Sequence, residues 1–189
     1  MNNSKPLCYQ ARMAILKVAR LGNPVLRGAA GEIPAGEVNQ PDLQRFIDDM
    51  VTTMHEYQGV GLAAVQVHEP IQVAVLEVAD NARYPGKAAV PLSVLINPTI
   101  VPLDDETEDD WEGCLSIPEI RGRVPRYKNL RVTALDREGN ALDFVASGFH
   151  ARVIQHEVDH LRGHVYMDRM PDLSTLTYLS EMARFWADR

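Results

Sequence analysis

The sequence predicts an α+β fold in which antiparallel or mixed β-sheets pack around a central helix that carries the motif H-E-x-x-H. Two observations support this prediction. An amphipathic helix precedes a series of β-rich runs, and an apolar helix follows the last of them. A parallel doubly wound sheet would instead alternate strands and helices along the chain. The order of elements therefore favours antiparallel strands with separate helices.

Length and composition indicate one globular domain, since the chain has 189 residues of which 46% are hydrophobic. No apolar run approaches the roughly 20 residues that a membrane helix needs. Six acids between Asp104 and Asp110 account for most of the net charge of −7, and we expect this run to be a solvated loop. The sequence shows no cluster of basic residues of the kind that would predict nucleic-acid binding. The only cysteines, Cys8 and Cys114, suit a reducing compartment.

We expect residues 1–13 to form a flexible tail ahead of the domain. The first 31 residues contain no acid and several basic residues, so an organellar presequence is the alternative. A start at Met13, with residues 1–12 as an extension, is a third interpretation. The cytoplasm is the expected location, with an organelle as the alternative.

The first predicted helix spans about Asp42 to Tyr57, where apolar residues recur at helical spacing. A glycine-containing stretch from Gly59 to Gln66 follows, and it lacks the Gly-Lys-Ser/Thr ending of a phosphate loop. The predicted strands and their connections are Ile71–Val78, a loop containing Pro85-Gly86, Ser93–Ile96, and a hairpin of Asn129–Asp136 and Ala141–Ser147 with its turn at residues 137–140.

The hairpin leads directly into the second predicted helix, which Ser147 and Gly148 start and Gly163 ends. Two stripes of this helix are apolar or carry histidine: Phe149, Val153, His156 and His160 on one, and Ile154, Val158 and Leu161 on the other. A helix that is apolar on two sides belongs in the interior of a fold.

His156 and His160 lie one helical turn apart, so both imidazoles can reach one metal ion. Glu157 then lies beside the metal, where a carboxylate can accept the proton of a water molecule. A catalytic metal site of this kind needs a third protein ligand. The metzincin pattern fails because Tyr166 stands at the position of its third histidine.

Two candidates for the third ligand remain. Glu181 lies 21 positions after His160, a spacing compatible with a gluzincin-like peptidase. Cys114, in Glu112-Gly113-Cys114-Leu115-Ser116, offers a thiolate that suits iron or zinc. A non-catalytic metal domain is a third interpretation, although a structural site would close all four ligand positions and would not need Glu157.

Three motifs, Gly59–Gln66, Glu112–Ser116 and Gln155–His160, occur in an order and spacing that resembles the peptide deformylases. The resemblance covers about residues 14 to 170, as a single catalytic domain, and leaves 171–189 as its C-terminal segment. It implies removal of the N-formyl group from the initiator methionine of nascent polypeptides. It also implies one divalent metal, Fe(II) physiologically, with zinc, nickel or cobalt able to occupy the site.

By the same resemblance, Cys114, His156 and His160 hold the metal and Glu157 is the general acid and base. The side-chain amide of Gln66 and the backbone N–H of Leu115 would stabilise the charge that develops on the formyl oxygen. Substrate contacts are expected from the backbone at Val60 and Gly61 and from an apolar pocket with Phe149 and Val153. The partners expected are N-formylmethionyl nascent peptides, with transient proximity to the ribosome but no direct nucleic-acid or membrane binding.

Two local features accompany this resemblance. Arg152 stands where many family members carry an aliphatic residue, and we expect its stem to run along the pocket rim with its charge in water. Glu112 and Arg126 are expected to form an ion pair beside Cys114. The C-terminal segment lacks the long basic helix that is common in the bacterial family, so it gives no support for ribosome binding.

Overall fold

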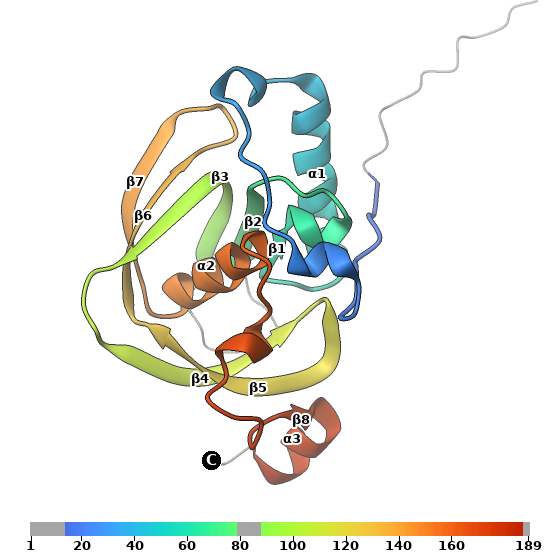
Figure 1. Cartoon of the computed structure of the whole chain (residues 1–189), viewed down its shortest axis with the longest axis vertical. Coiled ribbons are helices and arrows are strands. Elements are labelled where there is room, and N and C mark those ends of the chain that lie inside the picture. Colours follow the sequence, from blue (N-terminus) through green and yellow to red (C-terminus); the bar gives the residue numbers. More distant parts are fainter. Residues whose placement is uncertain (1–13, 79–87, 187–189) are drawn as a thin grey trace, which may run out of the picture.

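A computed structural model describes residues 14–78 and 88–186 of the chain. The predicted tail at residues 1–13, the predicted loop at Pro85-Gly86 and Cys8 lie outside these ranges. The fold is α+β, as predicted, and the pairings between its named strands are antiparallel throughout the described residues. Figure 1 shows the strands curving around one helix, α2 (Gly148–Leu161), which contacts both sheets.

The strands form two sheets. The larger has the order β1-β2-β3-β6-β7, with β1 (Gly61–Ala63), β2 (Val73–Val78), β3 (Val90–Pro102), β6 (Asn129–Leu135) and β7 (Ala141–Ser147). The smaller has the order β4-β5-β8, with β4 (Thr107–Cys114), β5 (Ile117–Tyr127) and β8 (Thr177–Tyr178). The predicted hairpin is confirmed as β6 and β7, whereas β4 and β5 were not predicted.

The acidic run from Asp104 to Asp110 was predicted to be a loop, and this prediction is wrong for its second half, which begins β4. Pairing with β5 explains the difference, and Asp109 forms an ion pair with Arg123 of that strand at 3.1 Å. A basic partner strand offsets the poor strand propensity of acidic residues.

The first helix, α1 (Pro41–Glu56), matches its prediction to within one residue at each end. Proline suits the first helical position, because its missing N–H would have no partner there. Ile47, Met50 and Met54 are fully buried and pack in the core that α1 shares with the larger sheet. Each such side chain contributes about 1.5–3 kcal/mol to folding.

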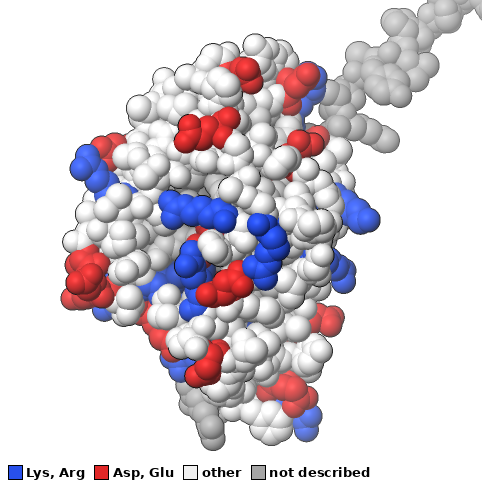
Figure 2. Space-filling model, in the orientation of Figure 1, with Lys and Arg blue, Asp and Glu red and all other residues white. Residues whose placement is uncertain are grey.

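Helix α2 begins after Ser147 and ends before Gly163, whose φ of +80° continues the chain in a left-handed conformation, as predicted for a C-terminal stop. The remaining helical segments are α3 (Leu179–Phe185) and the short 3₁₀ turns Pro24–Arg27, Ala35–Glu37, Ala64–Val67 and Tyr166–Arg169. Among the described residues, no helix is long and apolar enough to cross a membrane. On the face shown in Figure 2, acidic and basic side chains are interspersed.

Candidate metal centre and its pocket

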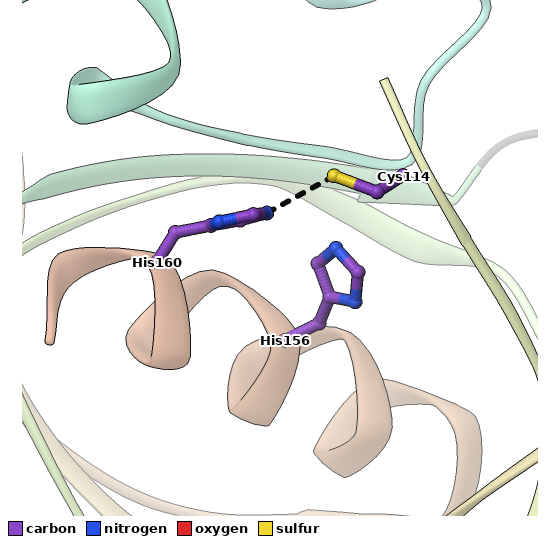
Figure 3. A group of neighbouring side chains, drawn as sticks. All are labelled: Cys114, His156 and His160. Atoms are coloured by element: carbon purple, nitrogen blue, oxygen red, sulfur yellow. Dashed lines mark hydrogen bonds between the residues drawn. The ribbon is translucent and has the colours of Figure 1, made fainter. Parts of the chain in front are cut away.

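Three potential metal ligands converge from two elements. Cys114 is the last residue of β4, and His156 and His160 lie on consecutive turns of α2. One donor atom from each lies within 4.8 Å of the others, and the Sγ of Cys114 lies 3.2 Å from the Nε2 of His160. Figure 3 shows the thiol and both imidazoles directed toward a common point. Among the acidic, histidine and cysteine side chains of the described residues, these three are the ones arranged so that they could hold a metal ion.

The chemistry of this donor set fits a divalent cation. Burial raises the pKa of the Cys114 thiol, but His160 and His156 outweigh burial and bring that pKa well below its ordinary value. The thiolate, which is the form that binds metals, is therefore favoured. Ligands of a tetrahedral zinc or iron site lie about 3.5 Å apart, given metal–ligand bonds of roughly 2.0–2.3 Å. The observed thiol–imidazole distance is close to that spacing.

Glu112 orients one of the histidines. Its Oε2 accepts a hydrogen bond from the Nδ1 of His156 at 2.9 Å, which leaves the Nε2 of that ring for a ligand. A carboxylate that fixes the second nitrogen of a histidine is the usual support of a metal-binding imidazole. Burial lowers the pKa of His156, but the nearby Cys114 and Glu112 raise it well above its ordinary value.

The predicted ion pair between Glu112 and Arg126 is confirmed, and it is bidentate at 2.9 and 3.0 Å. Arg126 also donates to Asp159 of α2 at 2.5 Å, and Arg169 donates to the same carboxylate. The two carboxylates and Arg126 are each at most 5% exposed. A buried charge network therefore joins β4, β5 and α2 directly behind the three potential ligands.

Arg152 corrects a prediction. Its charge does not reach into water: the residue is 3% exposed and its Nη1 donates to Glu112 Oε1 at 2.8 Å. The same guanidinium donates to the carbonyl of Val124 at 2.7 Å and to that of Glu108 at 2.5 Å. Arg152 is thus a second buried cation on Glu112, and it links α2 to the β4–β5 strand pair through hydrogen bonds that an aliphatic residue could not make.

Glu157 is buried beside the potential ligands. Its Oε2 is buried and has no hydrogen-bond partner among the described residues, and burial raises the pKa of its carboxyl group to about 7. A Cβ atom at Gly61 would come within 2.2 Å of Glu157 Oε1. Glycine is required there because the carboxylate packs on the backbone of β1, and not because of a positive φ.

The amide of Gln66 faces the same point. Its Nε2 lies 3.4 Å from the Sγ of Cys114 and 3.2 Å from the Oγ of Ser116, and its Oε1 accepts from the N–H of Ala63. The residue is 1% exposed. Because its oxygen is fixed by the backbone, the amide presents its N–H groups to the site. Ser116, which holds this orientation, was missed in the sequence because a single serine carries no pattern.

A pocket opens beside this centre. All four residues predicted to contact substrate line it: Val60, Gly61, Phe149 and Val153. So do Gln66, Leu115, Cys114, His156 and Glu157, together with Gly59, Gly113, Glu112, Arg152 and Trp111. The sequence analysis did not single out Trp111. The alternative ligand Glu181 lies elsewhere, on α3, where it pairs with Arg184.

The chain is similar to proteins of one known family. The family model for polypeptide deformylase matches residues 15–175. Peptide deformylase 1 of Bordetella pertussis is 47% identical over 162 residues, 85% of this chain and 90% of that protein. Peptide deformylase 2 of Ralstonia nicotianae is 51% identical over 141 residues, 75% of this chain and 80% of that protein.

A solved structure is also similar. The Met-Ala-Ser-bound class I type b peptide deformylase of Acinetobacter baumannii superposes with a TM-score of 0.82 at 37% identity, covering 84% of this chain and all of that one. The motifs, the two-sheet fold and these relatives point to one conclusion: the chain belongs to the polypeptide deformylase family.

Proposed function

We propose that this enzyme removes the formyl group from N-formylmethionyl nascent peptides and releases formate, using one divalent cation held by Cys114, His156 and His160. The observation that carries the proposal is the convergence of these three donor atoms beside a buried carboxylate. Fe(II) is the expected physiological ion, with zinc, nickel or cobalt as substitutes. Since the named relatives are bacterial, the expected setting is the bacterial cytoplasm, near translating ribosomes.

The residues divide the reaction between them. When bound, the cation supplies Lewis-acid activation of water and of the formyl carbonyl. Glu157 takes the proton of the attacking water and delivers it to the amine as the carbon–nitrogen bond breaks, so that water is consumed and formate and a free amino terminus are produced. The N–H groups of Gln66 and Leu115 donate to the formyl oxygen while it carries negative charge.

The pocket would hold the peptide through its main chain and its methionine side chain. Strand β1 forms one edge of the five-stranded sheet, so an extended peptide can add to it beside Val60 and Gly61. Main-chain pairing of this kind accepts many sequences. Phe149 and Val153 supply apolar surface for the methionine.

The test is release of formate from formyl-Met-Ala-Ser by protein purified without oxygen and loaded with Fe(II). Internal cleavage of an unformylated peptide is the control. Formate without cleavage of peptide bonds is the expected result. Cleavage of internal bonds without formate would contradict the proposal and favour a peptidase.

A further inference from the structure

The C-terminal segment reaches the wall of the pocket. Trp186, the residue that follows α3, contacts Trp111 of β4 edge to face, with ring centroids 5.3 Å apart and planes inclined by 77°. Trp111 is one of the residues that line the pocket beside the metal centre. Both tryptophans are half-buried. A residue 75 positions away in the sequence therefore supports an aromatic side chain of the pocket.

The segment is tied down where it meets the sheet. Its strand β8 pairs with β5 through Tyr178 and Thr177, and the hydroxyl of Thr175 accepts a hydrogen bond from the N–H of Arg123 at 3.0 Å. Helix α3 then packs against β5. These contacts fix the direction from which Trp186 approaches β4.

Trp111 needs such support because of its place in the sheet. β4 is an edge strand, since the smaller sheet has the order β4-β5-β8, so β5 is the one strand that pairs with it among the described residues. An aromatic side chain on an edge strand can adopt several rotamers unless a neighbour restricts it. Edge-to-face packing of two aromatic rings supplies that restriction in a defined geometry.

We propose that Trp186 is a positioning residue that holds Trp111 in place as an aromatic wall of the peptide pocket. The C-terminal segment thereby contributes to binding apolar side chains of the substrate peptide. This inference rests on the proposed function, because it takes the pocket beside the metal centre to be the peptide site. Trp186 is not among the residues that line the pocket, so the role assigned to it is positioning and not chemistry.

The first test separates binding from chemistry. Trp186→Ala should raise KM for formyl-Met-Ala-Ser by about two- to tenfold, the worth of one aromatic pair, while kcat stays within about twofold. Trp186→Phe should restore most of the affinity because it keeps an aromatic ring. Phe185→Ala is the matched control, since Phe185 lies next to Trp186 but is 59% exposed. An unchanged KM in Trp186→Ala, or an equal rise in Phe185→Ala, would overturn the proposal.

The second test needs neither metal nor turnover. The chain has two tryptophans, so both Trp186→Phe and Trp186→Ala leave Trp111 as the sole one. Time-resolved anisotropy of Trp111 should decay faster in Trp186→Ala than in Trp186→Phe, and the product peptide Met-Ala-Ser should bind the alanine variant two- to tenfold more weakly. Identical decays in two folded variants would refute the positioning role. Absence of formate release by the wild-type enzyme would refute the proposed function but would leave this anisotropy comparison valid.

Discussion

Substituting Glu112 by glutamine should destabilise the protein and weaken its hold on a cation. The carboxylate is 4% exposed and accepts from Arg126 Nε and Arg152 Nη1 on Oε1, and from Arg126 Nη2 and His156 Nδ1 on Oε2. A glutamine side chain has one oxygen and one NH₂ group, so its NH₂ group must face one of these pairs of N–H donors and cannot accept from them. It also leaves Arg152 without its carboxylate partner. Two charge-assisted hydrogen bonds at about 1.5–3 kcal/mol each give a loss of roughly 3 kcal/mol or more.

Thermal unfolding measures this loss directly. For a chain of this size, about 3 kcal/mol corresponds to a fall in Tm of roughly 6–12 °C. Affinity for zinc, titrated against a competing chelator, should fall about 10- to 100-fold, because His156 loses the carboxylate that orients it. Glu106→Gln is the matched control, since Glu106 pairs with Lys128 in an exposed position and should change Tm by less than about 2 °C. A Glu112→Gln protein with wild-type Tm and zinc affinity would refute the role assigned to this network.

Two further predictions concern the site and its charge network. Gln66→Ala should lower kcat for formyl-Met-Ala-Ser by about 10²- to 10³-fold with metal content unchanged, and a loss below tenfold would argue against its role as an oxyanion donor. The carboxyl groups behind the site should make the protein sensitive to acid. Burial alone would raise the pKa of Asp159, but Arg169 and Arg126 lower it. Burial likewise would raise the pKa of Glu112, but Arg126 and His156 lower it. Stability from lowered pKa values is complete above the unfolded values of about 4 and is lost as the pH falls below them. The urea midpoint should therefore be lower at pH 3 than at pH 6, with the drop beginning near pH 4. Asp159→Asn should show a smaller drop, and a wild-type midpoint independent of pH over that range would contradict this account.

Much of the structure was open to prediction from local patterns. The apolar stripe of α1 and the alternation of β6 and β7 reflect burial on one face, which a sequence records directly. The H-E-x-x-H spacing places two histidines on one face of α2 whatever the tertiary structure. The third potential ligand, Cys114, is 42 residues away from His156, and spacing alone left Glu181 as an alternative. The resemblance to the peptide deformylases favoured Cys114, and the fold brings its thiol to the helix.

The errors come from residues whose partners are distant in the sequence. The acids that begin β4 are largely exposed, as predicted, but pairing with β5 places them in a strand and not in a loop. Arg152 looks like a surface charge until Glu112 and the carbonyl groups of β4 and β5 surround it. A polar residue such as Arg152 is buried only because specific partners satisfy it, and hydrophobic patterning does not register such partners.

The most direct test of the central claim compares wild type with Glu157→Ala in one experiment that measures both bound metal and formate. Among the described residues, Glu157 forms no hydrogen bond with any of the three potential ligands. Removal of its carboxylate should therefore leave one divalent ion bound per chain. The account predicts retained metal with formate release from formyl-Met-Ala-Ser reduced by at least about 10²-fold. Formate release at the wild-type rate by the metal-loaded variant would contradict it.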